Sequence, residues 1–287
     1  MSRIAYVNGS YRPLAEAAVH IEDRGFQFAD GVYEVCEIRD GMVTDETRHL
    51  DRLWRSLGEL AIAAPMGRRA LALVMHEVMR RNRVRDGLVY VQVTRGAARR
   101  DFVFPDPPVR PSLIVLARST DRAKAEAVAA AGIAVITAPE SRWPRVDIKS
   151  TSLLPNVLAK QAAKQAGARE VWFVDRDGYV TEGGSSNAWI VTAAGELVTR
   201  SAESGILRGI TRTTLIDLIT RDGLVFVERP FTPAEAKAAR EAFVSAATAL
   251  ITPVVRIDGE PVGDGRPGPV ATRLRSTFHT VAEKLLI

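Results

Sequence analysis

Cysteine and histidine are scarce in this sequence, and their scarcity excludes several kinds of site. The single thiol, Cys36, cannot form an internal disulfide or a site that needs several thiolates. Because it lies in the strand-like stretch VYEVCEIR, we expect it to be a small buried apolar residue. The four histidines lack the H-x-H and HExxH spacings of metal sites, so we expect no bound metal (His20, His49, His76 and His279).

Long apolar runs are also lacking. None approaches the roughly 20 residues that a membrane span requires, so we expect neither a transmembrane helix nor a membrane partner. The stretch MSRIAYVNGS contains one arginine and no apolar block of signal-peptide length. These features predict a cytoplasmic protein.

A long basic tract is missing as well, although the net charge is +5 and the pI is near 9.6. Acidic and basic residues alternate along nearly the whole chain. The densest basic patch, RRNRVR at residues 80–85, lies at a predicted helix end and contains no aromatic side chain on which a base could stack. We therefore expect no nucleic-acid partner.

The length and patterning predict an α/β (α+β) protein of two units. A chain of 287 residues divides most naturally into two domains. We predict a smaller N-terminal domain at residues 1–118, a linker at 119–125 and a larger domain at 126–287. In the first domain, Asn8-Gly9 and Asp40-Gly41 are hairpin turns between strand-like stretches, and helical periodicity covers residues 50–61 and 68–81.

The second domain alternates strand-like and helix-like pieces. We predict strands at 133–137, 171–174, 188–192 and 225–228, and helices at 155–166, 211–220 and 233–240. The last helix begins with Thr232, Pro233 and Glu235, which form the pattern of a capping box.

Lysine is rare beside arginine, with six lysines against thirty-three arginines, and one lysine is unusually placed. Five lie in helical stretches, where the ammonium normally stays in water (Lys124, Lys160, Lys164, Lys237 and Lys284). Lys149 instead lies in the extended stretch VDIKSTSLLPN. An amine withdrawn from water deprotonates more readily and can form a Schiff base with a carbonyl. The alternative is an ordinary salt bridge to Asp147 or a neighbour.

Two further stretches carry groups that suit a phosphorylated cofactor. In VTEGGSSNAWIV, glycines permit close approach of the backbone, and Glu182 could keep a ring nitrogen protonated. In GILRGITRTTL, the helix that begins near Thr211 offers N–H groups to a phosphate, and Arg52 could supply a counter-charge. The alternatives are a glycine turn, a threonine-capped helix and a surface arginine. Lysine, carboxylate and anion site together match the needs of pyridoxal phosphate.

The sequence resembles the fold-type IV pyridoxal-phosphate aminotransferases, and among them the bacterial D-amino acid aminotransferases. The motifs EDRGFQFADGVYEV, HLDRL, VQVTRG, DIKS, LAKQ, TEGGSSN, GITR and ITPVVRIDG carry the likeness over almost the entire chain. The resemblance implies a two-domain fold with the cofactor between the domains and a homodimer. It also implies that Lys149 forms the internal aldimine and that Glu182 faces the pyridine nitrogen. Arg52, Ile210 and Thr211 would then bind the phosphate, and Leu207 would lie against the ring.

The chain departs from this family at the substrate site. The resemblance assigns the substrate carboxylate to Tyr33, Arg100 and a histidine, but Phe102 occupies the histidine position, and Arg99 is a further candidate donor. At the phosphate, Ala246 and Ala247 replace hydroxyl residues, which leaves backbone N–H groups and Thr248 as donors. Ala29 stands where a glycine is usual.

These observations predict ping-pong transamination of D-amino acids, such as D-alanine, with 2-oxo acids, such as 2-oxoglutarate. Three alternatives share the scaffold: a branched-chain L-amino acid aminotransferase, an (R)-selective amine transaminase and an aminodeoxychorismate lyase. A non-catalytic phosphate- or nucleotide-binding module is the rival from another class.

Overall fold

The structure is a computed structural model that describes residues 3–285, and the chain forms two compact units. Unit 1 contains the chain up to Arg122, the short segment Ile148–Ser152 and the segment from Glu283. Unit 2 contains Ala123–Asp147 and Leu153–Ala282. The first break falls within the residues predicted as a linker, but the two returning segments differ from the predicted division into consecutive domains.

The return of Ile148–Ser152 to unit 1 has a clear cause in backbone hydrogen bonding. Tyr33 N donates to Lys149 O at 3.0 Å, and Thr151 N donates to Gly31 O at 2.9 Å. Lys149 therefore lies against a strand of unit 1, whereas the sequence analysis placed it in the domain of residues 126–287. Chain order alone does not reveal such a pairing.

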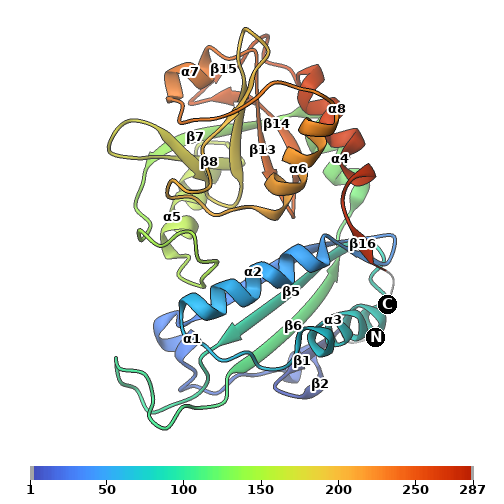
Figure 1. Ribbon diagram of the computed structural model, residues 1–287, viewed down its shortest axis with the longest axis vertical. Helices are drawn as coiled ribbons and strands as arrows, with labels where there is room; N and C mark the ends of the chain where they lie inside the picture. Colours follow the sequence, from blue (N-terminus) through green and yellow to red (C-terminus); the bar gives the residue numbers. More distant parts are fainter. Residues whose placement is uncertain (1–2, 286–287) are drawn as a thin grey trace. The chain divides into compact units, whose positions relative to one another are not determined.

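Unit 1 is built on an antiparallel sheet of seven strands within residues 3–285 (Figure 1). The strand order is β16-β4-β3-β5-β6-β1-β2. Both predicted hairpins are confirmed, since β1 pairs with β2 across Asn8-Gly9 and β3 pairs with β4 across Asp40-Gly41. The strands are β1 (Ile4–Val7), β2 (Ser10–Pro13), β3 (Gly31–Arg39), β4 (Met42–Thr44), β5 (Gly87–Thr94), β6 (Ser112–Ser119) and β16 (Lys284–Leu285).

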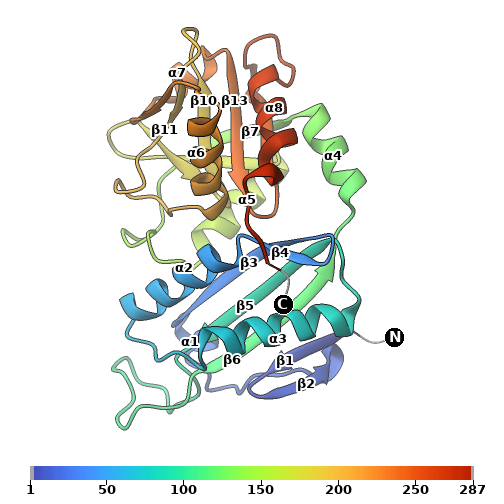
Figure 2. The same cartoon turned by 45° about the vertical axis from the view of Figure 1, so that its right-hand side comes forward.

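Two helices, α2 (Glu46–Glu59) and α3 (Arg68–Asn82), cover one face of this sheet (Figures 1 and 2). Their apolar stripes pack on alternate residues of the strands, as the predicted periodicity requires. From Val32 onward the buried positions of β3 alternate (Val32, Glu34, Cys36 and Ile38), so Cys36 is buried as predicted. The other short helices are η1 (Leu14–Glu16) and α1 (Arg24–Phe28).

Unit 2 is built on a nine-stranded mixed sheet with the order β12-β11-β10-β13-β14-β7-β8-β9, and β15 pairs with β14. One apolar cluster takes side chains from strands near both ends of this order, so the sheet curls around it. The strands are β7 (Ile133–Pro139), β8 (Glu170–Val174), β9 (Val180–Gly183), β10 (Asn187–Val191), β11 (Leu197–Thr199), β12 (Phe226–Glu228), β13 (Glu241–Ala246), β14 (Leu250–Ile257) and β15 (Glu260–Pro261).

The helices of unit 2 cover the outside of this sheet. Helices α6 (Ile210–Arg221) and α8 (Pro269–Thr277) share a core with β10, β13 and β14, and α5 (Leu154–Gln165) packs against β7 and β8 (Figure 2). The predicted N-cap is confirmed in α7 (Pro233–Lys237), where Glu235 N donates to Thr232 Oγ1 at 3.1 Å, whereas the Glu235 carboxylate, which a capping box would direct to Thr232 N, pairs with Arg229. The remaining helices are α4 (Arg122–Ala131) and η2 (Phe278–Thr280). Among residues 3–285, no helix has the length and apolarity needed to span a membrane.

Candidate active site

Lys149 lies beside an aromatic side chain of unit 1. Its Nζ is 4.3 Å from the centroid of the Tyr33 ring, and that ring stacks on Tyr90 with centroids 5.8 Å apart. Lys149 N donates to Ser56 Oγ at 3.3 Å, which joins the lysine backbone to α2. Burial, followed by the influence of Tyr33, raises the pKa of Tyr90 to about 12. Lys149 thus packs against the Tyr33 ring, which Tyr90 supports from within unit 1, and an ammonium over an aromatic face is a favourable contact.

Arg52 is held by a buried carboxylate on β3. Its Nε and Nη2 donate to the two oxygens of Glu34 at 2.7 and 2.8 Å. His49 Nδ1 lies 2.7 Å from Glu34 Oε2. Burial would raise the pKa of Glu34, but the charge of Arg52 and the hydrogen bonds from Arg52 and His49 lower it to about 2. Glu34 is therefore ionised at neutral pH and fixes the orientation of the Arg52 guanidinium.

The predicted substrate-site residues Arg100 and Phe102 lie in the exposed loop between β5 and β6. The Arg100 guanidinium carbon lies 4.7 Å from the centroid of the Phe28 ring, and the Phe102 ring lies 5.6 Å from the same ring. Phe102 is 83% exposed, so its side chain is available to a ligand or to another protein surface.

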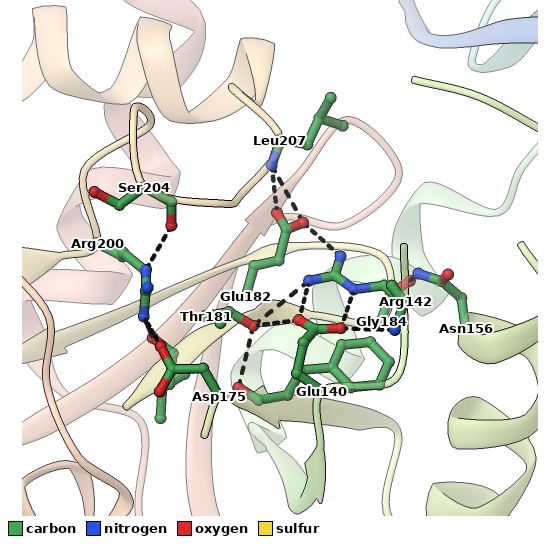
Figure 3. A network of polar contacts seen from close by, with 12 residues as sticks. Glu140, Arg142, Asn156, Asp175, Thr181, Glu182, Gly184, Arg200, Ser204 and Leu207 are labelled. Atoms are coloured by element: carbon green, nitrogen blue, oxygen red, sulfur yellow. Dashed lines mark hydrogen bonds and ion pairs between the residues drawn. The ribbon is translucent and has the colours of Figure 1, made fainter. Parts of the chain in front are cut away.

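Glu182 lies near the end of β9 in unit 2, as a buried carboxylate with several donors around it (Figure 3). Arg142 Nη1 donates to Oε1 at 2.6 Å, and Asn187 Nδ2 donates to Oε2 at 3.0 Å. Leu207 N donates to both oxygens at 3.2 Å. The predicted residues Glu182 and Leu207 are thus brought together in the structure, and Asn187 Nδ2 also donates to Leu207 O at 3.0 Å.

Arg142 is bound by a second carboxylate, that of Glu140. Its Nε and Nη2 donate to the two Glu140 oxygens at 2.9 and 2.6 Å, and Thr181 Oγ1 donates to Glu140 Oε2 at 2.9 Å (Figure 3). Burial alone would lower the pKa of Arg142, but Glu140 and Glu182 raise it above its usual range. Two carboxylates and one guanidinium leave this cluster with one net negative charge.

The start of α6 presents the helix N–H groups for which the sequence predicts an anion site. The first N–H groups of a helix lack acceptors within the helix, and Ile210 and Thr211 are the first two residues of α6. The preceding Gly209 packs closely, because a Cβ there would lie 2.1 Å from Asn187 Oδ1. No side chain caps Gly209, which has extended backbone. The helix end is therefore held in the same network as Glu182.

Ala247 lies in the tight turn between β13 and β14. Ala249 N closes the turn on Ala246 O at 3.1 Å, and Arg275 Nη1 donates to Ala249 O at 2.8 Å. The alanines leave only backbone groups to contact a ligand here, while the Thr248 side chain is exposed. These hydrogen bonds hold the turn in place, and it carries alanines at the positions where the related enzymes usually have hydroxyl residues.

These residues fit pyridoxal phosphate in their chemistry. Glu182 is a buried carboxylate whose cluster retains negative charge, which suits a protonated ring nitrogen. The uncapped start of α6 suits a phosphate, and Lys149 is an amine outside any helix. Among residues 3–285, no group of three or more potential metal ligands occurs.

Several residues that organise the site were missed in the sequence analysis. Glu170 is buried and accepts hydrogen bonds from Ser185 and Ser186 Oγ at 2.8 and 3.0 Å, which fixes the turn after Glu182. Glu34 had one usable signal, since a charged residue among the buried positions of an alternating strand needs a partner. Arg142 had none, because it lies in a loop in which arginine is common.

Comparison with known proteins gives a consistent family. The model of a family described as amino-transferase class IV matches residues 31–257. A D-alanine aminotransferase of Staphylococcus haemolyticus is 38% identical over 278 residues, which cover 97% of each chain. A D-alanine aminotransferase of Listeria monocytogenes is 38% identical over 274 residues, which cover 95% of this chain and 93% of the relative.

Solved structures with the same fold are of enzymes named for a different substrate class. The T.th. branched-chain amino acid aminotransferase with pyridoxamine 5′-phosphate superposes with a TM-score of 0.91 at 27% identity, over 97% of this chain and 93% of that one. The branched-chain enzyme of Escherichia coli gives 0.89 at 25% identity, over 98% and 95% of the two chains. The fold class that we predicted is thereby confirmed.

Proposed function

Since the chain belongs to the class IV aminotransferases, which depend on pyridoxal phosphate, we propose that it moves the amino group of a D-amino acid, such as D-alanine, to a 2-oxo acid, such as 2-oxoglutarate. The contact between Lys149 and Tyr33 carries this proposal. It puts a reactive amine, 4.3 Å from the ring centroid, beside the tyrosine that is proposed to bind the substrate carboxylate. The relatives named D-alanine aminotransferase support the choice of a D-amino acid.

Lys149 is proposed to do both the covalent and the proton-transfer work. When bound, pyridoxal phosphate supplies an aldehyde that condenses with amines and a ring that withdraws electrons from the substrate Cα. The Nζ of Lys149 would take the proton from Cα and return it to the cofactor C4′. The Tyr33 ring beside Nζ limits its access to water on that side.

Glu182 and the start of α6 are proposed to hold the cofactor. The Glu182 carboxylate, kept in place by Arg142, Asn187 and Leu207 N, would accept a hydrogen bond from the protonated ring nitrogen. Ile210 and Thr211 would donate N–H groups to the phosphate, and Arg52 would add charge. Leu207 would contact the ring, and the turn of Ala247 would offer backbone donors and the Thr248 hydroxyl.

Arg100 and Tyr33 are proposed to bind the substrate carboxylate, with Arg99 as a further donor. Phe102 cannot donate, so the family's third donor is lost. For this reason branched-chain L-amino acid transamination is the second candidate, and the structures named as branched-chain enzymes support it. Amines of (R) configuration are a further alternative on the same grounds.

We also propose a homodimer in the cytoplasm. Unit 1 exposes several large apolar side chains in and beside the loop of Arg100, which is unusual for a surface that stays in water (Ile21, Phe26, Phe102, Val103 and Phe104). A second copy of the chain would cover them. Light scattering on purified protein tests this, and a monomer at micromolar concentration would refute the dimer.

Two experiments test the function, and the first is borohydride labelling of the cofactor-binding lysine with matched lysine variants; the second is a substrate panel. Purified protein is incubated with pyridoxal phosphate and reduced with borohydride, and the labelled residue is found by mass spectrometry. We expect the label on Lys149, and a Lys149→Ala variant without detectable turnover. Lys164→Ala is the control, because Lys164 is an exposed residue of α5. A colourless protein without a label would instead favour a non-catalytic module.

The panel itself separates the substrate classes. Single-turnover absorbance changes are recorded with D-alanine, L-leucine and (R)-1-phenylethylamine. We expect D-alanine to react fastest. A faster reaction with L-leucine would replace the D-specific proposal with the branched-chain one.

A further inference from the structure

The loop between β5 and β6, which carries Arg100, is attached at its base to the segment around α1 (Figures 1 and 2). Asp23 and Ala97 form an isolated antiparallel bridge, and Arg24 N donates to Gly96 O at 2.9 Å. Gly96 has a φ of +103°, and a Cβ there would lie 2.1 Å from Arg110 O. Only glycine permits this approach, so both strands of the loop base are fixed together.

The tip of the loop is held by a buried arginine of α1. Arg24 Nη1 donates to the carbonyl of Asp101 at 2.6 Å, and Nη2 lies 3.5 Å from the carbonyl of Phe102. Arg24 is only 3% exposed, although the loop residues that it contacts are exposed. Burial of a guanidinium costs free energy. Because Arg24 is nevertheless buried and binds two carbonyls of an exposed loop, we infer that the conformation of this loop is important.

An ion pair with a carboxylate explains how Arg24 can be buried. Arg24 Nε donates to Asp30 Oδ2 at 2.8 Å, and Arg95 Nε donates to the same oxygen at 2.7 Å. Arg95 in turn donates to the carbonyls of Leu60 and Ala61, at the end of α2. Asp30 thus connects the arginine that holds the loop tip to the helical layer of unit 1.

The aromatic residue that ends α1 provides a platform for the loop side chains. The Phe28 ring lies 4.7 Å from the Arg100 guanidinium carbon, 4.9 Å from that of Arg24 and 5.6 Å from the Phe102 ring. Helix α1 stops directly after Phe28, because Ala29 has a φ of 56° in the left-handed region. That backbone angle is the physical reason for the glycine usual at this position.

We propose that Arg24 is a positioning residue for substrate recognition, which fixes the loop of Arg100 and Phe102 through the carbonyls of Asp101 and Phe102. Phe28 assists by carrying the Arg100 guanidinium on its ring. The proposal rests on the proposed function, in which Arg100 binds the substrate carboxylate. With Phe102 in place of a donor, the substrate carboxylate has one hydrogen bond fewer. A fixed loop compensates for part of the lost binding free energy, because an Arg100 side chain that is already oriented loses less entropy on binding.

Tryptic cleavage of the loop measures the anchoring directly. Arg99 and Arg100 are exposed, and trypsin cuts after arginine once a loop is mobile. Two variants are compared with wild-type protein, each loaded with pyridoxal phosphate: Arg24→Met and Arg24→Lys. Arg24→Met should still fold, because Asp30 keeps its contact with Arg95. Val78→Ala, a buried position in α3, is the control for a general loss of stability.

We expect cleavage after Arg99 or Arg100 to become about tenfold faster or more in Arg24→Met, because bonds from a charged donor to two carbonyls are lost. Arg24→Lys should also cut faster, since one ammonium cannot reach three acceptors. The KM for D-alanine should rise by about the same factor with kcat changed far less, and the dissociation constant of the cofactor should stay constant. Val78→Ala should lower the thermal midpoint without changing either readout.

Unchanged cleavage and KM in folded Arg24→Met would overturn the proposal. An equal increase in Val78→Ala at a matched thermal midpoint would overturn it as well. If wild-type protein fails to react with D-alanine, the proposed function is refuted, and the tryptic rates alone then support or overturn the anchoring by Arg24.

Discussion

Arg142 Nη1 lies 2.6 Å from Glu182 Oε1, and both side chains are almost completely buried. The pair alone would be neutral, which would leave little charge to stabilise a protonated ring. Glu140 changes this balance, because it binds the same guanidinium at 2.6 Å and neutralises it. Glu182 therefore keeps its negative charge together with a fixed orientation, and this combination suits a carboxylate that binds a pyridinium.

The first prediction concerns the charge of Glu182. In Glu182→Gln the amide keeps the shape of the side chain but cannot stabilise a positive ring, so we expect proton removal from D-alanine to slow by about 10²–10³-fold. Single-turnover absorbance measures this rate. The control is Asp175→Asn, which breaks a comparable ion pair with Arg200 in unit 2 and should change the rate only slightly. A rate within tenfold of wild type in Glu182→Gln would contradict the assignment.

The second prediction tests the close packing at the start of α6. In Gly209→Ala the new methyl group would lie 2.1 Å from Asn187 Oδ1 and displace the amide that donates to Glu182. We expect a loss of about 1–3 kcal/mol in the free energy of unfolding and weaker cofactor binding. Denaturant unfolding and cofactor titration measure the two effects.

Gly58 provides the matched control for that substitution. It lies within α2, and a Cβ there meets no atom within 4 Å. Gly58→Ala should therefore stabilise the protein by about 0.5–1 kcal/mol through helix propensity, without affecting cofactor binding. A Gly209→Ala variant as stable as Gly58→Ala would show that the Asn187 side chain moves aside at little cost in free energy.

The third prediction concerns the pH dependence of stability in unit 1. The folded pKa of Glu34 is about 2, below the usual value of 4.5, because Arg52 and His49 outweigh the effect of burial. A lowered folded pKa contributes stability above the unfolded pKa, and this stability is lost as the pH falls from about 4.5 to 2. The loss should be about 3 kcal/mol.

Glu34→Gln is the test of that assignment. The variant should be less stable at pH 7, since Arg52 loses a charged partner in a buried setting, and its unfolding free energy should fall less steeply between pH 4.5 and 2. Denaturant unfolding at a series of pH values gives both quantities. Parallel pH profiles for the two proteins would show that other carboxylates dominate acid unfolding.

Local signals in the sequence predicted much of the fold. The Asn-Gly and Asp-Gly turns and the apolar periodicity of α2, α3 and α6 act over a few residues, and these elements occur close to the predicted positions. Helices α1 and α8 were missed. The first has only five residues, and the second follows the glycine-rich stretch GDGRPG, which resembles a loop.

The candidate site was predictable only where a residue type is itself the signal. Lys149 is unusual in an arginine-rich chain, and Glu182 follows from its glycine turn. The residues that hold them are distant in sequence: Arg142 is 40 residues from Glu182, and Ser56, which binds Lys149 N, is 93 residues from Lys149. Such pairs depend on the register of the sheets, which local patterns do not determine.

The last prediction concerns a substitution that restores a hydrogen-bond donor in the loop between β5 and β6, and it rests on the proposed function. Phe102 is 83% exposed, so Phe102→His should fold normally, losing only the contact with Phe28. An imidazole N–H beside Arg100 should lower the KM for D-alanine by about threefold to tenfold, the discounted value of one exposed hydrogen bond to a carboxylate. Phe102→Leu, which cannot donate, should show no such gain.

The pH dependence gives this prediction a sharper form. The new histidine carries charge only below its pKa, ordinarily about 6.5, which neighbouring Arg100 would lower and Asp101 would raise. The KM advantage of Phe102→His over wild type should therefore grow as the pH falls from about 8 to 6, because an imidazolium binds a carboxylate more strongly than a neutral ring. Steady-state kinetics at several pH values measure the ratio of the wild-type KM to the KM of Phe102→His. A ratio that stays at one throughout, in a variant with wild-type thermal stability, would mean that position 102 does not face the substrate carboxylate.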